Sequence, residues 1–282
     1  MMSVNTTLKI AILMTCYNRV KKTLKCLDNL HKASVPDNIN FDIYLVDDNS
    51  PDKTGKIVKD KYPDINVIPG TGSLFWNRGM RLAWKNARRR HDYDFYLWIN
   101  DDTFINTDAI KIIFYDYYSL LNNDIEAIVS GVCQGSNSTC VTYGGRDKEQ
   151  KIIIPNGLPQ PCKYINGNFT LVSKKIFYKV NYLSYKYTHA AGDYDYGLRA
   201  IKSDFNCYIS SSVLAICDGH NEEQDWLSPD IPLQKRVKNL FSIKGWDYLF
   251  FVIENYGLFH AMNRIIRGFL RAAFPTIVKK VR

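Results

Sequence analysis

Two pairs of neighbouring carboxylates could do chemistry in this chain. Asp101 and Asp102 end the apolar, aromatic stretch "YLWINDDT", and Asp193 and Asp195 open the stretch "GDYDYGLRA". Charged side chains are rarely buried without a partner. The first pair could cap the helix that is expected to follow it, or hold a hard divalent cation through its oxygens. The second pair could complement a helix dipole, act as a general base, or do both.

Polar loops also follow three other apolar runs. They read "TCYN" at 15–18, "VDDNS" at 46–50 and "IPGTGS" at 68–73. Ligands of parallel α/β sheets bind beyond the carboxyl ends of the strands. Four such loops, the "INDDT" loop included, therefore favour one shared binding edge over four unrelated turns. For "DDNS" a plain Asx-turn or helix cap stays open as the alternative to ligand binding.

The elements that must position these loops alternate between strand-like and helix-like periodicity. Such alternation predicts an α/β fold with a mostly parallel central sheet flanked by helices. In the first half we expect strands at 8–18, 41–50, 65–70 and 93–101, and helices at 19–33, 52–62, 77–90 and 107–121. In the second half we expect strands at 127–133, 141–145, 151–155, 167–173 and 207–220, and helices at 173–180 and 191–204.

Length and cysteine usage bound the class of protein. The 282 residues suffice for one large domain with an appendage, which we expect at 1–225 and 226–282. The seven cysteines form no CxxC pair, no leader-like segment precedes the first strand, and no run of about 18 apolar residues is present. These features favour reduced thiols and a cytoplasmic location, without a spanning helix.

The net charge of +9 is concentrated toward the C-terminus. No zinc-finger or other nucleic-acid-binding motif accompanies it, so a nucleic-acid partner is not expected. The last helix interleaves basic and apolar side chains, which suits either an anionic membrane surface or packing on the main domain. Its apolar members are Leu258, Met262, Ile265, Ile266, Phe269, Leu270 and Phe274, and its basic members are Arg264, Arg267 and Arg271.

Six segments in order resemble one known family. They are "TCYNR", "LVDDNSPDKT", "GSLFWNRGMRLAW", "WINDDT", "INGNFTLVSKKIF" and "GDYDYGLRA", spread over about residues 8–221. Together they resemble the family-2 inverting glycosyltransferases with a GT-A, Rossmann-like fold. The stretch "GSLFWNRGM" is most similar to rhamnosyltransferase-like members that build bacterial surface polysaccharides. The resemblance implies a donor-binding half at about 1–105 and an acceptor-binding half at about 106–225.

The resemblance also implies which residues hold the donor nucleotide. The loops that follow the first strands would hold the base and the ribose. The diphosphate would lie at the start of a helix, where backbone amides are free to bind phosphate and glycine lets the backbone come close to it. Arg81 is an alternative to Arg78 as the basic side chain near the diphosphate. The implied nucleotide-binding residues are Thr15, Tyr17, Asn18, Asp48, Gly70, Asn77, Arg78 and Asp101, while Asp47 would orient its loop.

A divalent cation, Mn²⁺ or Mg²⁺, is implied at the "NDD" stretch. Asp102 is the implied ligand, with His220 as a further one that could equally be an ordinary core or surface histidine. The family motif is usually Asp-any-Asp, whereas this chain has Asn100 before Asp101 and Asp102. The departure leaves open which carboxylate touches the metal.

Asp193 is the implied catalytic base, because an inverting transfer needs one carboxylate to take the acceptor proton. Relatives commonly carry Glu where this chain has Gly192, so Asp195 stays an alternative for that role. Five residues would line the donor sugar and acceptor. They are Trp76, Asn166, Gly167, Asn168 and Asp195. For Trp76, packing in the core is an equally good explanation.

The function implied is a metal-dependent, inverting hexosyltransferase. It would move a sugar from a UDP- or dTDP-linked donor to a glycan acceptor, lipid-linked, at the inner face of the cytoplasmic membrane. One alternative is a sugar-nucleotide nucleotidyltransferase, which "TCYNRVKK" disfavours because it lacks the glycines of a phosphate loop. The other is a non-catalytic scaffold subunit that binds a nucleotide sugar.

Overall fold

The computed structural model describes residues 7–219 and 228–275, and the chain divides into two compact units. The first unit comprises Met1–Tyr185 and Asp193–Gly219, and the second comprises Lys186–Gly192 and His220–Arg282. The short segment Lys186–Gly192 therefore groups with the C-terminal part of the chain. The domain boundary predicted at 225/226 stays a prediction.

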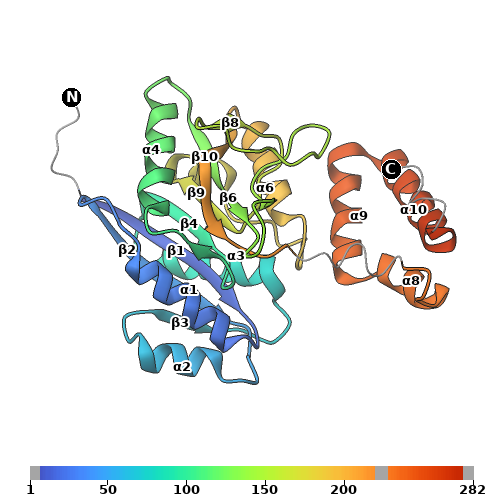
Figure 1. Ribbon diagram of the computed structural model, residues 1–282, viewed down its shortest axis with the longest axis horizontal. Helices are drawn as coiled ribbons and strands as arrows, with labels where there is room; N and C mark the ends of the chain where they lie inside the picture. Colours follow the sequence, from blue (N-terminus) through green and yellow to red (C-terminus); the bar gives the residue numbers. More distant parts are fainter. Residues whose placement is uncertain (1–6, 220–227, 276–282) are drawn as a thin grey trace. The chain divides into compact units, whose positions relative to one another are not determined.

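One mostly parallel sheet forms the centre of the first unit (Figure 1). Its strand order is β3-β2-β1-β4-β9-β6-β10-β5, with β7 paired to β6 and β8 to β10. The pairs β1–β2, β1–β4, β2–β3 and β6–β10 are parallel, whereas β9 runs antiparallel to β4 and β6. The strands are β1 (Leu8–Cys16), β2 (Ile39–Asp47), β3 (Asn66–Pro69), β4 (Phe95–Ile99), β5 (Phe104–Ile105), β6 (Ala127–Gln134), β7 (Val141–Tyr143), β8 (Gln160–Pro161), β9 (Phe169–Ser173) and β10 (Asn206–Ile216). The predicted α/β fold is confirmed.

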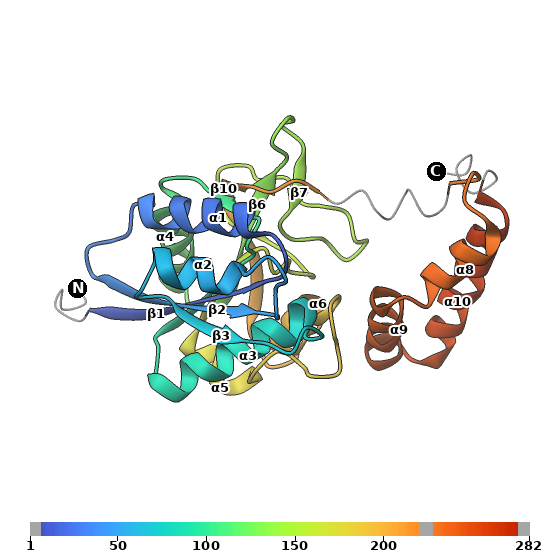
Figure 2. The same cartoon turned by 90° about the horizontal axis from the view of Figure 1, so that it is seen from below.

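Helices cover both faces of the sheet, as Figure 2 shows. On one face lie α1 (Val20–Lys32), α2 (Thr54–Lys61) and α4 (Ala109–Leu121), and on the other lie α3 (Phe75–Arg90), α5 (Lys174–Val180) and α6 (Gly192–Ile201). The helical spacing predicted for α3 is confirmed, because the members of its apolar stripe are fully buried. These are Met80, Ala83, Trp84 and Ala87.

Two local predictions differ from the structure. The strand expected at 151–155 is wrong, because Ile152 makes only an isolated bridge with Arg146. Ile154 is exposed, so the apolar run does not face a core that would select a strand. The two-residue strands β5 and β8 were not predicted, since so short a segment carries no alternating pattern.

Residues 233–273 of the second unit are largely helical, as predicted for the C-terminal extension. They contain α8 (Leu233–Leu240), α9 (Ile243–Tyr256) and α10 (Leu258–Ala273). Gly257 separates the last two helices with φ +87°, a conformation that favours glycine. Among residues 7–219 and 228–275 no helix is both long and apolar enough to cross a membrane.

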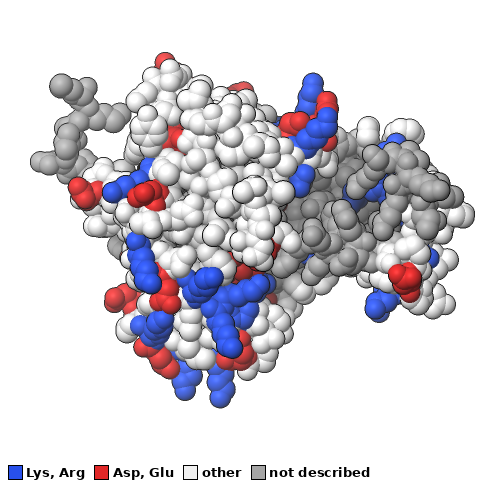
Figure 3. Space-filling model, viewed as in Figure 1, with Lys and Arg blue, Asp and Glu red and all other residues white. Residues whose placement is uncertain are grey.

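Basic side chains gather over the part of the molecule where α1 and α2 lie, with acidic side chains between them (Figure 3). On this face the positive charge is therefore broken up rather than continuous. Such mixed surfaces are typical of solvent-facing helices.

Candidate functional site

The carboxyl ends of β1, β2 and β4 lie at one edge of the sheet. Cys16 at the end of β1 pairs with Asp47 at the end of β2, and β4 lies parallel on the other side of β1. Parallel pairing places the loops after all three strands together. The predicted site loops therefore share one edge.

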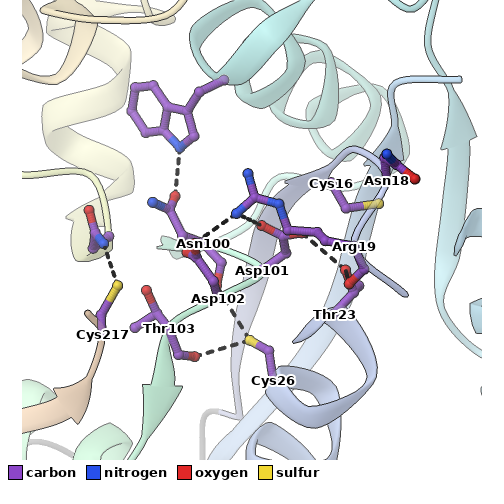
Figure 4. A network of polar contacts seen from close by, with 12 residues as sticks. Cys16, Asn18, Arg19, Thr23, Cys26, Asn100, Asp101, Asp102, Thr103 and Cys217 are labelled. Carbon is purple, nitrogen blue, oxygen red and sulfur yellow. Dashed lines mark hydrogen bonds and ion pairs between the residues drawn. The ribbon is translucent and has the colours of Figure 1, made fainter. Parts of the chain in front are cut away.

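Asp101 and Asp102 meet a basic residue that the sequence analysis did not single out (Figure 4). The Arg19 guanidinium donates to Asp102 Oδ2 at 2.7 Å and lies 3.4 Å from Asp101 Oδ1. Thr23 at the start of α1 donates its hydroxyl to Asp101 Oδ2 at 3.0 Å. Burial raises the pKa of Asp101 to about 7 although Arg19 opposes the shift, because an ionised carboxylate loses hydration there.

The capping alternative for this pair is not what the structure shows. The residue before α4 is Asp108, and it makes no side-chain capping hydrogen bond. Asp101 is 4% exposed, whereas the Asp102 side chain retains 11% of its surface. Of the two, Asp102 is the carboxylate better placed to meet a ligand, and its role as a metal ligand stays a prediction.

The second acidic loop holds the start of α3. Asp48 is 4% exposed and accepts from the amides of Gly72, Leu74 and Phe75 at 2.7, 2.8 and 3.0 Å. These bonds use three of roughly four lone-pair positions of the carboxylate. Asp48 therefore binds amides at the start of a helix distant in the sequence rather than forming a local Asx-turn or N-cap. Its contact with a nucleotide base stays a prediction that needs the remaining position.

Asp47 orients the same loop, as expected. Its oxygens accept from the amides of Ser50 at 3.1 Å and Gly55 at 2.9 Å. A Cβ added at Gly55 would lie 2.4 Å from Asp47 Oδ2, so glycine permits the close approach.

The end of β1 joins this arrangement. Thr15 is buried against Gly79, where an added Cβ would lie 2.4 Å from its Oγ1. Tyr17 is 51% exposed and therefore accessible to a ligand. Asn18 donates its amide to Ser50 Oγ at 3.0 Å, with φ +52°. These contacts link the first two loops, and the nucleotide-binding roles of the three residues stay predictions.

The polar side chains at the start of α3 have protein partners. Asn77 is fully buried and donates to the Ser184 carbonyl at 2.8 Å. The Arg78 guanidinium lies 4.5 Å from the centre of the Tyr185 ring. Both contacts tie α3 to the segment before Lys186. A role for these two residues in binding the diphosphate remains a prediction. Gly70, the other residue predicted to bind the nucleotide near this helix, packs against Asp48.

The second acidic pair separates into two environments. Asp195 accepts from Arg199 Nε at 2.8 Å, and Arg199 also donates to the carbonyls of Val180 and Tyr182. Asp193 instead accepts from the amides of Gly167 at 3.0 Å and of Tyr194. Burial raises the pKa of Asp193 to about 6, and the two amides oppose that rise.

Trp76 connects the two acidic sites. Its indole N–H donates to Asn100 Oδ1 at 2.6 Å, next to Asp101. Its ring lies against Gly167, where an added Cβ would be 2.3 Å from Trp76 Cζ2. Gly167 in turn holds Asp193 through its amide. Carboxylates about 90 residues apart in the sequence are thus linked through one tryptophan.

The neighbours of Gly167 are supported by the protein itself. Asn166 Oδ1 accepts from the Asn168 amide at 3.1 Å, and the buried Asn168 side chain donates to Cys217 Sγ at 3.1 Å. Their contact with a sugar stays a prediction. His220 lies outside the described residues. Within residues 7–219 and 228–275, no group of three or more His, Cys, Asp or Glu side chains gathers as a metal site.

The functional-site residue that the sequence analysis missed is Arg19. Its signal was available in "TCYNR", because it is a basic residue directly after the first strand, at the edge where two carboxylates were expected. The pairing could not be read from the sequence, since Arg19 and Asp102 are 83 positions apart.

Comparisons with known proteins identify the family of the chain. The family model described as glycosyl transferase family 2 matches residues 11–181, more than half of the chain. Protein RfbJ of Shigella flexneri is 27% identical over 137 residues, which are 48% of this chain and 92% of that protein.

Solved structures show the same fold. A structure of TarS residues 1–349 from S. aureus has a TM-score of 0.55 at 17% identity, covering 95% of this chain and 72% of that one. The mannosyltransferase PcManGT from Pyrobaculum calidifontis, in complex with GDP-Man and Mn²⁺, has a TM-score of 0.59 at 14% identity, covering 96% and 74%. These likenesses confirm the predicted GT-A architecture.

Proposed function

The chain belongs to glycosyl transferase family 2, and on this premise we propose that it transfers one hexose, with inversion, from a nucleoside-diphosphate sugar to a glycan acceptor. The observation that carries the proposal is Asp193. Its carboxylate has a pKa raised to about 6 and is joined through Gly167 and Trp76 to the loop of Asp101 and Asp102.

Asp193 acts as the general base of a single displacement. It takes the proton of the acceptor hydroxyl while that oxygen bonds to the anomeric carbon of the donor. The bond from the anomeric carbon to the diphosphate oxygen breaks, and its electron pair leaves with the nucleoside diphosphate. A pKa near 6 keeps the carboxylate mostly ionised at neutral pH while making it more basic than an ordinary Asp. Asp195 is occupied by Arg199, which favours Asp193 for this role.

Residues at the edge of the sheet fit a divalent cation bound together with the donor. Mg²⁺ and Mn²⁺ prefer oxygen ligands, and sites shared with phosphates commonly use one or two carboxylates rather than a full protein cage. Asp102 supplies such a carboxylate, and the cation would take the place that the Arg19 guanidinium holds at 2.7 Å from Asp102 Oδ2. When bound, the cation supplies charge stabilisation for the departing diphosphate. The structures of PcManGT and of GalNAc-T7 contain Mn²⁺.

The donor nucleotide lies along the loops after β1 and β2. Tyr17 offers an exposed ring, and Asp48 retains one acceptor position for a base N–H. A pyrimidine nucleotide, UDP or dTDP, is our choice, and structures of TarS with UDP and with UDP-GlcNAc support it. We take surface-polysaccharide synthesis as the process, because the stretch "GSLFWNRGM" resembles family members that build such polysaccharides.

We place the acceptor on a lipid at an anionic membrane surface that α10 contacts. Along this helix Leu258, Phe259, Met262, Ile266, Phe269 and Leu270 remain exposed even though α8 and α9 pack against it. The exposed Arg267 and Arg271 lie among them and complement anionic headgroups. Co-sedimentation with vesicles of anionic and of neutral lipid tests this. Equal binding to both, or equal binding after Arg267→Gln and Arg271→Gln together, would refute it.

A thermal-shift panel tests the donor site. UDP, dTDP and GDP, each with and without Mn²⁺, should raise the melting temperature by mass action where they bind. We expect the largest rise with one pyrimidine nucleotide and Mn²⁺, and loss of the metal-dependent part in Asp102→Ala. No rise with any of these nucleotides would refute the donor site, whereas nucleotide binding without sugar transfer would favour the scaffold alternative. Transfer of a nucleotidyl group from a nucleoside triphosphate to a sugar 1-phosphate, with release of pyrophosphate, would favour the nucleotidyltransferase.

A further inference from the structure

We propose that Asp247 in α9 is a positioning residue for transfer, because it fixes the backbone that leads into Asp193. The proposal rests on the proposed function of Asp193 as the base. Asp247 is 3% exposed and accepts three successive backbone amides, those of Thr188 at 2.9 Å, His189 at 2.6 Å and Ala190 at 2.8 Å. All four residues belong to the second unit of the chain.

The clamped segment has no regular structure of its own. Residues 182–191 form no helix or strand, so their amides find no partner in a ladder or a helical turn. Partly buried amides need an acceptor, and an ionised carboxylate makes stronger hydrogen bonds than a neutral oxygen does. One side chain thus supplies the acceptors for three consecutive donors, and it fixes the path of the backbone over these residues.

The next residues carry that constraint to the base. Ala191 has φ +61° and is buried, and Gly192 begins α6, one residue before Asp193. The left-handed region is costly for alanine, and such a conformation persists only where the surroundings impose it. The Asp247 clamp on one side and α6 on the other impose it here. Only Ala191 and Gly192 lie between the clamped segment and Asp193, so a shift of the clamp moves the base.

Positioning matters because the base must reach the acceptor hydroxyl within hydrogen-bond distance during the displacement. A misplacement of about 1 Å can cost about a hundredfold in rate. Loss of the clamp should therefore lower kcat while leaving donor binding intact, since the predicted nucleotide-binding residues lie on other loops.

The test compares Asp247→Asn with Glu254→Gln in the full chain. Glu254 is the matched control, because it lies on the same helix and accepts hydrogen bonds from the side chains of Lys186 and Tyr187 in the same segment. With UDP-sugar hydrolysis or transfer as the assay, we expect Asp247→Asn to lower kcat about tenfold or more at an unchanged donor KM. Glu254→Gln should stay within about twofold, as exposed ion pairs contribute little.

Two readouts separate positioning from a general loss of folding. Hydrogen exchange of the peptide containing 188–190 should accelerate in Asp247→Asn, while exchange in β1 and β4 stays as in the wild type. The acid limb of the pH–rate profile should also move, because the surroundings of Asp193 change. Should Asp247→Asn not fold, Asp247→Glu keeps the charge and is expected to lower kcat in the same way.

The results for Asp193→Asn and Asp247→Asn together show whether the positioning role or the base assignment is wrong. If Asp193→Asn abolishes transfer and folded Asp247→Asn matches Glu254→Gln in kcat, the positioning role is wrong and the base is not. If Asp193→Asn keeps wild-type kcat, the base assignment itself is wrong. Unchanged exchange at 188–190 in Asp247→Asn would also overturn the clamp.

Discussion

Asp193→Asn should remove transfer and at the same time stabilise the folded protein increasingly as the pH rises. Burial raises the pKa of Asp193 from its ordinary value of 3.8 to about 6, so the folded state binds this proton more tightly than the unfolded chain does. The stability that Asp193 contributes is therefore fully present below about pH 4 and is lost as the pH rises through about 6. The neutral amide side chain that replaces the carboxyl does not titrate and carries no such loss.

The size of the effect follows from the two pKa values. Between pH 5 and pH 7.5 the linkage relation gives a loss of at most about 1.4 kcal/mol for the wild type relative to the variant. Asp193 as a whole residue is partly exposed, so solvent screening reduces this toward about 1 kcal/mol. For a unit of this size, about 1 kcal/mol corresponds to about 2–4 °C in melting temperature. Hydrogen bonds lost to Gly167 or Tyr194 lower the variant's stability equally at both pH values, so they cancel.

The assay is a thermal melt of both proteins at pH 5 and at pH 7.5. The gap between variant and wild type should widen by about 2–4 °C toward the higher pH. Asp60→Asn, which removes an exposed carboxylate of α2, reports the effect of a charge change alone. The wild-type rate should fall about tenfold from pH 7.5 to pH 5, as the ionised fraction of a base with a pKa near 6 falls. A gap that does not change with pH would refute the buried-base reasoning.

Three further substitutions test the edge of the site. Arg19→Gln removes the positive charge beside two adjacent carboxylates, so the free energy of unfolding measured in urea should fall by about 1 kcal/mol. Mn²⁺ should restore the lost stability, and no effect of Mn²⁺ would contradict the cation site. Gly70→Ala would place a Cβ 2.8 Å from Asp48 Cα, so we expect a cost of about 1–3 kcal/mol and weaker UDP binding by calorimetry; wild-type UDP affinity would contradict this. Gly167→Ala forces the Trp76 ring to move, which should lower kcat and shift the tryptophan fluorescence; unchanged fluorescence would show that the ring stays in place.

The spacing of apolar residues in the sequence predicted most of the helices and strands, but none of the contacts between residues far apart in the sequence. The strands and helices around the first sheet edge were predictable because each has an apolar run or stripe several residues long. The two-residue strand β5 was not predictable. The strand predicted from the apolar run 151–155 was wrong, because apolar content alone does not show whether a hydrophobic core is there to pack against. At the site, the loops were predictable as strand ends. The link from Asn100 through Trp76 to Gly167 was not, because only tertiary packing joins those positions.

In each acidic pair, the surroundings of the two carboxylates, rather than their positions in the sequence, distinguish their roles. In the pair of Asp101 and Asp102, the more buried member is held by Thr23 while the other keeps more exposed surface. In the pair of Asp193 and Asp195, the more buried member is held by Arg199. On a helix, side chains two positions apart point in different directions, so in α6 one carboxylate can support the structure while the other faces a ligand. Asp195→Asn, which breaks the ion pair with Arg199, should therefore lower the melting temperature first, and the amide substitution at the facing member of each pair should lower the rate first. An Asp195→Asn variant with wild-type stability and no activity would reverse the assignment within the pair of Asp193 and Asp195.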